Sequence, residues 1–391
     1  MSTRTRWISI VVIVAIGGGA LAVLELMGPR RTVLDSLVPG AVERRLYVAD
    51  DSEVFVYDID DGHRRLHEFD VDDCDSMKGI AVSLEHQALY LTSADSNDLV
   101  CIDLATERVR WRRNYGEYPD SVNITADGKT LLVPCRDEKS WPWFAVDAGT
   151  GEPLKEIRTE KGKKYPKRAV GPKWTRSKGP HNTLRSADGS HFYLESITVP
   201  NITVVDVATM EKIGVIGPFS SGVRPFVIDH DEELAFANVD GLLGFEIASF
   251  TAADPIDSEI IHRVEAKTPP ARLNALPPPD ELPHNTPSHG LALSRDGTEL
   301  WMADGYYGLL YVYDLTATPP RFVDSIPLYE DDDDRPEPTW ITFSLEGDYA
   351  YAGSGQVVDT KTRRIVAHVV DSNLTLEVVF VDGRATRAAQ R

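Results

Sequence analysis

The sequence predicts an all-β protein, a seven-bladed β-propeller whose first blade is completed by the C-terminal strand. Three observations support this fold class. A unit of short strands, in which apolar and polar residues alternate, recurs seven times along the 391 residues, with Asp-Gly or Thr-containing turns between the strands. The first unit lacks its innermost strand, and a spare strand remains at the end of the chain. Four short antiparallel strands in each unit of roughly 40 residues or more are typical of propeller blades.

The chain begins with a segment that we expect to enter a membrane. Arg4 and Arg6 precede Trp7–Leu24, a stretch without a charged residue. An apolar run of about 18–20 residues spans a bilayer as a helix, and arginines before it hold that end in the cytoplasm. Residues 1–27 are therefore predicted to be a cytoplasmic tip and a single transmembrane helix. The remainder would be extracytoplasmic, either periplasmic or extracellular.

A cleaved signal peptide is the alternative for this segment. Ala20-Leu21-Ala22 offers the small residues of a cleavage site, and Gly17–Gly19 would loosen the helix before it. The apolar run continues to Met27, which favours the uncleaved anchor over a secreted protein. Residues 28–43 contain two prolines and mixed polarity, so we expect them to form a stalk.

The seven units follow one another without a domain break. They span Arg45–Phe69, Gly79–Trp111, Ser121–Ile157, Asn182–Gly217, Pro225–Glu265, Leu291–Ile326 and Trp340–Val369. The spare strand Leu374–Gly383 is predicted to pair inside the first unit, because an unclosed ring would expose strand edges at both ends. The propeller would then occupy residues 44–383, with residues 384–391 as a tail.

The units resemble the blades of the YVTN or YncE-like family of seven-bladed propellers. The resemblance rests on S-x-D-G turns at Ser186–Gly189 and Ser294–Gly297, each followed by an aromatic-rich strand. It rests also on V-V-D-x-x-T at Val204–Thr209 and a shortened form at Val357–Thr360. It covers residues 44–383 and implies an exported propeller, but many functions share such blades.

Composition and motifs exclude several classes of function. The formal net charge is −20, from 61 acidic and 41 basic residues, which argues against a nucleic-acid partner. Nucleophile-elbow, phosphate-loop, dinucleotide-binding and H-E-x-x-H zinc motifs are all missing. Cys74, Cys101 and Cys135 include no C-x-x-C pair, so we interpret them as buried apolar residues, with one disulfide left open.

Insertions between consecutive units indicate which face of the propeller binds. They comprise Thr159–Gly179, Ala266–Pro287 and the shorter Tyr329–Pro338. All three connect the last strand of one blade to the first strand of the next, so they open on the same face. The first insertion is basic and the third is acidic. They are either solvated loops or a bipolar rim that docks a partner.

The same face receives the first residue of each inner strand, around the central channel. Polar or aromatic residues occupy this position: Lys78, Asp120, His181, Arg224, His289 and Trp340. We expect them to form a ligand-binding mouth, in which His181 and His289 could hold one divalent metal ion. The alternative is a set of polar residues that bond water and strand ends.

These observations predict a monomeric, membrane-anchored binding or scaffold module for an unknown protein or small molecule. The alternative is an enzyme at the channel mouth, since lactone hydrolases and lyases share this architecture. In that reading His181 and His289 are metal ligands or general bases, Asp120 orients them, and Arg224 clamps an anion. The sequence leaves open whether the protein is catalytic.

Overall fold

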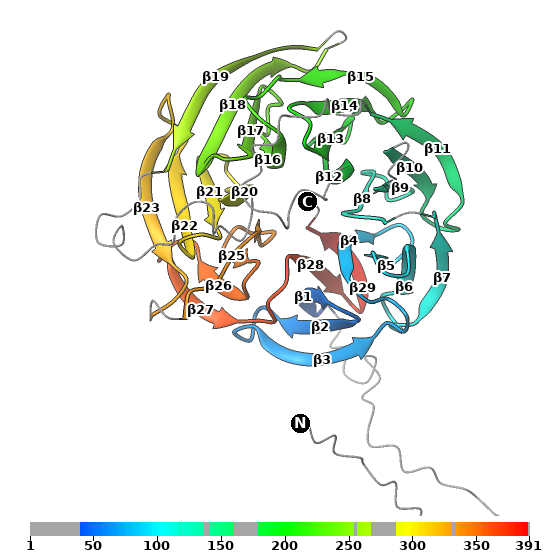
Figure 1. Cartoon of the computed structure of the whole chain (residues 1–391). Coiled ribbons are helices and arrows are strands. Elements are labelled where there is room, and N and C mark those ends of the chain that lie inside the picture. Colours follow the sequence, from blue (N-terminus) through cyan, green and yellow to red (C-terminus); the bar gives the residue numbers. More distant parts are fainter. Residues whose placement is uncertain are drawn as a thin grey trace, which may run out of the picture.

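Seven antiparallel sheets surround a central axis as the blades of a propeller (Figure 1). The computed structural model describes residues 40–116, 118–136, 141–159, 179–253, 256–266, 287–330 and 334–389. This confirms the predicted all-β, seven-bladed fold. No helix in the described part of the chain has the length and apolar character needed to cross a membrane. The predicted anchor, residues 1–27, lies outside the described residues.

The strands of each blade pair in the following order. Blade 1 contains β29 (Arg384–Ala388), β28 (Leu374–Val381), β1 (Val42–Asp50), β2 (Glu53–Asp58) and β3 (Arg64–Asp70). Blade 2 contains β4 (Met77–Ser83), β5 (Ala88–Ser93), β6 (Asp98–Asp103) and β7 (Val109–Asn114). Blade 3 contains β8 (Asn123–Ile124), β9 (Thr130–Pro134), β10 (Pro142–Asp147) and β11 (Pro153–Arg158).

The remaining four blades each have four strands. Blade 4 contains β12 (Gly179–Arg185), β13 (His191–Ile197), β14 (Ile202–Asp206) and β15 (Glu211–Ile216), and blade 5 contains β16 (Val223–Ile228), β17 (Leu234–Val239), β18 (Gly244–Thr251) and β19 (Asp257–Glu265). Blade 6 contains β20 (Ser288–Leu293), β21 (Glu299–Asp304), β22 (Leu309–Asp314) and β23 (Arg321–Pro327), and blade 7 contains β24 (Ile341–Phe343), β25 (Tyr349–Ala352), β26 (Gln356–Asp359) and β27 (Arg364–His368).

The two ends of the described chain close the ring, as the missing first strand predicts. β28 pairs antiparallel with β1, in a register that runs from Val42 opposite Val381 to Ala49 opposite Leu374. Val42 and Glu43, which we expected in the stalk, therefore already belong to a strand. Their backbone groups find partners in β28, and this extends the propeller beyond the predicted boundary.

The structure corrects the prediction that residues 384–391 form a tail. Arg384–Ala388 form β29, a fifth strand of blade 1, after a turn at Asp382-Gly383 in which both residues have positive φ. Gln87 of blade 2 holds this strand, since its side-chain amide exchanges hydrogen bonds of 2.8 Å with both the N–H and the carbonyl of Ala385. The sequence RATRA lacks a regular apolar alternation, so the strand depends on backbone pairing with β28 and on tertiary contacts, which include the Gln87 bonds and an ion pair between Arg387 and Glu346.

Repeated turn chemistry explains why the units fold alike. In blade 4 the Asp206 carboxylate accepts hydrogen bonds from the backbone N–H and the hydroxyl of Thr209, at 2.8 and 2.6 Å. Ser186 donates at 2.7 Å to Asp188 in the preceding S-x-D-G turn. Such side-chain caps satisfy backbone groups at the turns and fix each hairpin. The three cysteines are buried, as expected, and no disulfide joins them.

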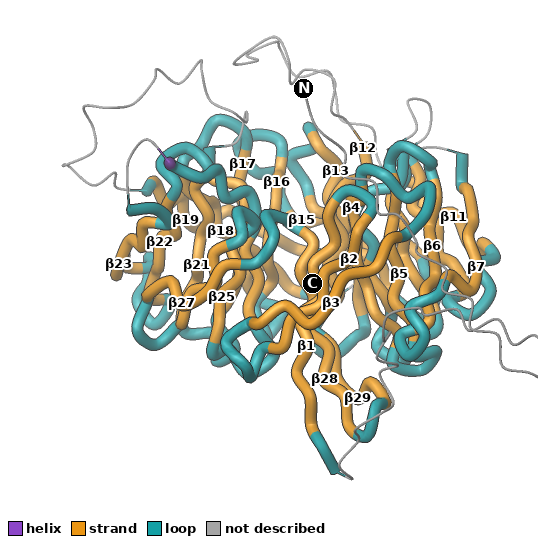
Figure 2. Tube along the Cα trace, turned by 90° about the horizontal axis from the view of Figure 1, so that it is seen from below, coloured by secondary structure: helices purple, strands orange, loops and turns teal. Residues whose placement is uncertain are grey.

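The propeller has two distinct faces. The inner strands run in the same direction along the axis, so their first residues share one face, here called the mouth face. The insertions leave and rejoin the described chain on this face. β1 starts at the opposite face, where Val42 lies beside the end of β28. Figure 2 shows β1, β28 and β29 extending beyond the other blades on that opposite side.

Candidate functional site

Three neighbouring inner strands carry a β-bulge at the same position on the mouth face. In each bulge, two residues of the inner strand stand opposite one residue of the second strand. The bulges are His181-Asn182 in β12, Arg224-Pro225 in β16 and His289-Gly290 in β20. The residues opposite them are Glu195, Asn238 and Ala303. A bulge redirects side chains out of the regular alternation and is common beside functional sites.

His181 and His289 meet across the inner edge of blade 5. Their ring centroids are 6.3 Å apart, in an edge-to-face arrangement with an interplanar angle of 69°. Nδ1 of His289 lies 2.9 Å from the carbonyl oxygen of Thr339. Because a carbonyl only accepts, Nδ1 of His289 donates in this contact. The indole of Trp340 is 6.2 Å from the His289 ring, between centroids. Residues of blades 4, 6 and 7 thus form one cluster.

Glu195 is the buried partner of His181. Its Oε2 lies 2.7 Å from His181 Nδ1, and its side chain has no exposed surface. Burial raises the pKa of the Glu195 carboxyl to about 8, against the opposing charges of Arg224 and Arg136. The imidazole and the carboxyl therefore share a proton in a setting where neither is well solvated. Glu195 was missed at the sequence level because it lies within an ordinary strand, FYLES.

Two buried ion pairs flank the histidines. Arg224, only 3% exposed, donates through Nε to Asp240 Oδ1 at 2.9 Å. Asp120, 4% exposed, forms an ion pair with Arg136. The Arg136 Nε donates in turn to the carbonyl of Pro180, the residue before His181. Asp120 is thus linked to the cluster through Arg136.

The remaining predicted residue lies apart from the cluster. Lys78 is half-buried in β4 of blade 2. Burial raises the pKa of Asp50, and the charge of Lys78 opposes that shift, which places the two side chains near each other. Among the described residues, no hydrogen bond or ion pair joins Lys78 to either histidine or to Arg224. The structure therefore brings His181, His289 and Trp340 into one cluster. Arg224 occupies the equivalent bulge of blade 5 and acts by its charge on Glu195, and Asp120 is linked to the cluster through Arg136.

The positions of the possible ligands bear on whether the mouth could bind a metal ion. The two histidine rings are 6.3 Å apart between centroids, and Nδ1 of His289 is engaged with Thr339, so an ion at this ring would have to be bound by Nε2. Within the described ranges, however, the only three His, Cys, Asp or Glu side chains whose ligand atoms all lie within 4.8 Å are Asp188, His191 and Glu232. Those residues belong to turns and strands near the opposite face. An ion at the mouth would thus have two histidine ligands from the described chain.

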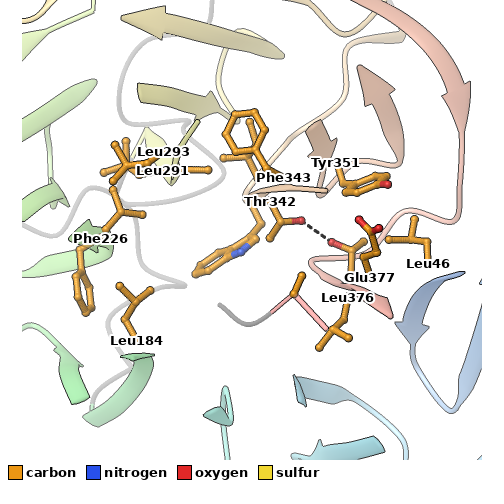
Figure 3. Close-up of a pocket in the computed structure, with 16 residues that line it drawn as sticks. Leu46, Leu184, Phe226, Leu291, Leu293, Thr342, Phe343, Tyr351, Leu376 and Glu377 are labelled. Atoms are coloured by element: carbon orange, nitrogen blue, oxygen red, sulfur yellow. Dashed lines mark hydrogen bonds between the residues drawn. The ribbon is translucent and has the colours of Figure 1, made fainter. Parts of the chain in front are cut away.

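A cavity of about 210 Å³ occupies the central channel (Figure 3). Its wall is formed by inner strands and is mainly apolar: Leu46, Leu184, Phe226, Val227, Leu291, Ala292, Leu293, Trp340, Ile341, Thr342, Phe343, Tyr351, Thr375, Leu376, Glu377 and Ala389. Trp340 belongs both to this wall and to the histidine cluster. The channel is therefore an apolar chamber beneath a polar mouth, rather than a polar, water-lined pore.

The fold and the site together define a seven-bladed β-propeller with a polar mouth over an apolar channel. Solved structures of three other propellers are similar to it. The periplasmic gluconolactonase PpgL of Pseudomonas aeruginosa has a TM-score of 0.62 and 13% identity, with 90% of this chain and 99% of that chain covered. Hydrazine synthase of Kuenenia stuttgartiensis has a TM-score of 0.60 and 16% identity, over 84% of this chain and 93% of the other.

The third similar structure is the Cps50 (Swd1) β-propeller domain of Myceliophteria thermophila. Its TM-score is 0.58 at 14% identity, over 84% of this chain and 95% of that chain. Such low identities establish the fold alone. No protein-family model matches the sequence, and comparison with curated proteins finds no match.

Proposed function

We propose that this protein is an exported, membrane-anchored propeller of the YVTN or YncE-like type that binds a small anionic ligand at its mouth face. The observation that carries the proposal is the convergence of His181, Arg224 and His289 from three adjacent blades through equivalent bulges. An arginine and two imidazoles at one point form a donor set suited to carboxylate or phosphate oxygens. Blade 2 has a register shift at the equivalent place, at Lys78, but among the described inner strands a histidine or arginine occupies this place only at the bulges of blades 4 to 6.

The placement of the chain ends supports a mouth that is open to solutes. The described chain starts at Gly40, where its N–H donates to Asp382 Oδ1 on the face opposite the mouth. An anchor in residues 1–27 would thus hold the propeller by that opposite face. The basic and acidic insertions would then surround a mouth directed away from the membrane and could dock a protein partner as well.

Ligand binding is tested on the full-length protein in lipid nanodiscs, with empty nanodiscs as the reference. Acetate and gluconate serve as probes, and saturation-transfer NMR detects their binding. We expect dissociation constants in the millimolar range, raised at least tenfold by Arg224→Met and by His289→Ala. His191→Ala is the matched control, because His191 is also paired with a glutamate, Glu232, but lies away from the mouth. Binding that survives both mouth substitutions would refute the proposal.

Anchoring and export are tested separately. Fractionation of cells and sequencing of the mature N-terminus would reveal an intact Met1 in the membrane fraction. A new N-terminus near Ala20–Ala22 would identify a cleaved signal peptide instead, and the protein would be secreted.

An enzyme at the mouth is the second candidate, and the His181–Glu195 pair is the observation that favours it. A histidine hydrogen-bonded to a buried carboxyl has the arrangement of a general base and its orienting partner. Two of the similar structures carry enzyme names, so gluconolactone is a rational first substrate. Hydrolysis that Glu195→Gln and His181→Ala both abolish would support catalysis.

Metal dependence is measured on the same variants. Stoichiometric metal that is lost in both His181→Ala and His289→Ala would support a metal-dependent enzyme. Hydrolysis that persists without bound metal would leave the His181–Glu195 pair as the base.

A further inference from the structure

We infer that the central cavity holds the apolar part of the ligand whose anionic group is bound at the mouth. The ligand would then be an amphipathic carboxylate with a hydrocarbon or aromatic portion of about eight carbon atoms. This inference rests on the proposed function for the anionic group, and it adds the chemical class of the remainder of the ligand.

The size and lining of the cavity give the class of the apolar group. An apolar cavity of about 150 Å³ stays dry and admits one benzene molecule. The cavity here has about 210 Å³, and leucine, phenylalanine and isoleucine side chains dominate its wall. In proportion, it accommodates an alkyl chain or a substituted ring of about eight carbons.

The polar groups of the wall are already engaged with protein partners. The hydroxyls of Thr342 and Thr375 are 2.8 Å apart and bond to each other. The Glu377 carboxylate accepts from Arg44 Nε at 2.9 Å and from the backbone N–H of Leu345 at 2.7 Å. Figure 3 shows Glu377, Thr342 and Tyr351 on one side and Leu184, Leu291 and Leu293 on the other. The wall therefore favours an apolar guest over a hydrated one.

Mouth and cavity are continuous along the same strands. Leu291 follows His289 by two residues in β20, and Phe226 follows Arg224 by two residues in β16. Because of the bulges, Leu291 and Phe226 each lie one residue of the neighbouring strand below the mouth residues, a depth of about 3.3 Å. Trp340 lies beside His289 and also lines the cavity. A carboxylate at the mouth thus has its first carbon atoms at the entrance to the apolar chamber.

A chain-length series tests the inference. Straight-chain carboxylates from acetate to decanoate are titrated into the full-length protein in nanodiscs, with empty nanodiscs subtracted. Burial of each methylene should improve affinity about fourfold, and the gain should end near octanoate when the chamber is full. Affinity that does not change with chain length would overturn the inference, although acetate binding would still support the proposed function.

Variants of the wall separate the chamber from the mouth. Leu293→Trp and Leu184→Trp each place an indole in the cavity at a half-buried position. We expect each variant to abolish the increase in affinity with carboxylate chain length and to leave acetate binding unchanged. Two variants are used so that the test still stands if one of them does not fold. Octanoate affinity that is unchanged in both folded variants would refute the chamber. A different result would refute the anionic mouth: the parent protein binds octanoate but not acetate, and Arg224→Met still binds octanoate.

The protein's own C-terminus is the competing occupant, because Ala389 already lines the cavity. A variant that ends at Ala389 tests this. Equal octanoate affinity in the full-length protein and in this shortened variant supports an external ligand. Binding that occurs only in the shortened protein would assign the chamber to the chain end and overturn the inference.

Discussion

Nε of Arg44 lies 2.9 Å from Oε1 of Glu377, a residue 333 positions further along the chain. The terminal nitrogens of the same guanidinium contact both carboxylate oxygens of Asp348 at 2.9 Å. Arg44 is in β1, Glu377 in β28, and Asp348 next to β25 of blade 7. One side chain thus ties both ends of the chain to the neighbouring blade, at the seam where the ring closes.

Replacement of Arg44 should open this seam. Arg44→Met leaves the Glu377 side chain, which has no exposed surface, without its charged partner. Loss of one member of a buried pair costs about 3–5 kcal/mol of unfolding free energy. Urea unfolding measures the loss, and Arg64→Met is the control because Arg64 pairs only with exposed Asp61. An unfolding free energy that falls equally in both variants would contradict a special role for the seam.

Truncation of the C-terminus should act in two steps. A chain that ends at Gly383 loses β29 and its contact with Gln87 but retains β28, so it should fold as a monomer with lower stability. A chain that ends at Asn373 also lacks β28 and exposes the edge of β1. It should aggregate or fail to fold, because unpaired edges pair with other chains. Size-exclusion chromatography separates the outcomes, and two indistinguishable truncations would contradict closure by β28.

Acid should destabilise the protein partly through His63. Its side chain is 4% exposed and lies 3.2 Å, at Nε2, from the hydroxyl of Tyr351. Burial, helped by the positive charge of Arg44, lowers the pKa of His63 to about 4. The unfolded chain takes up a proton near pH 6.5, so folding stability falls from that pH down to about 4. The full decrease in unfolding free energy between these two pH values is on the order of 3 kcal/mol.

The variant His63→Asn should weaken this pH dependence. Asparagine tolerates the positive φ of 60° at this position and does not titrate. We expect the difference in unfolding free energy between pH 7 and pH 4 to shrink relative to the parent. An identical pH profile in the two proteins would show that His63 is not the titrating group.

Asn238 should hold the bulge that presents His289. Its amide donates to Gly244 O at 2.8 Å and to Ser288 Oγ at 3.1 Å, and its oxygen accepts from the N–H of Gly290 at 3.0 Å. Asn238→Leu leaves the buried N–H of Gly290 without its acceptor, whereas Gly244 O and Ser288 Oγ still bond to each other. The substitution should cost about 1–3 kcal/mol of unfolding free energy.

A binding readout separates this positioning role from simple packing. Asn238→Leu should weaken acetate binding at the mouth even at temperatures where the variant is fully folded. Ala235→Gly, a core change in the same strand β17, should lower stability without that effect. Equal acetate affinity in the folded variants would limit Asn238 to a structural role.

The architecture was predictable because local signals recur. S-x-D-G turns, alternating strands and a first unit one strand short each have a direct structural counterpart, and together they predict seven blades and their closure. β29 was not predictable, because RATRA has no apolar period and depends on Gln87, distant in sequence. The blades depend on interactions between residues close in sequence, whereas β29 depends on a contact between residues far apart in sequence.

The candidate site was predictable only in part. His181, Arg224 and His289 stand out because they occupy equivalent positions at the start of inner strands. Glu195 and Asp240, the partners of His181 and Arg224, lie elsewhere in the blades, as does Arg136, the partner of Asp120. A charged residue at such a position gives no sign of what it contacts. Lys78 shared the expected position, yet no hydrogen bond or ion pair joins it to the cluster within the described chain, since position within a repeat does not fix where a long side chain points.

The pairing of β1 with β28 also has a consequence for how the protein is made. Blade 1 is the first to emerge during synthesis, yet its inner strand is among the last residues to be added. Blades 2 to 7 can form in the order of translation, whereas blade 1 must wait until β28 has been synthesised. The blade that is synthesised first is therefore the last to be finished.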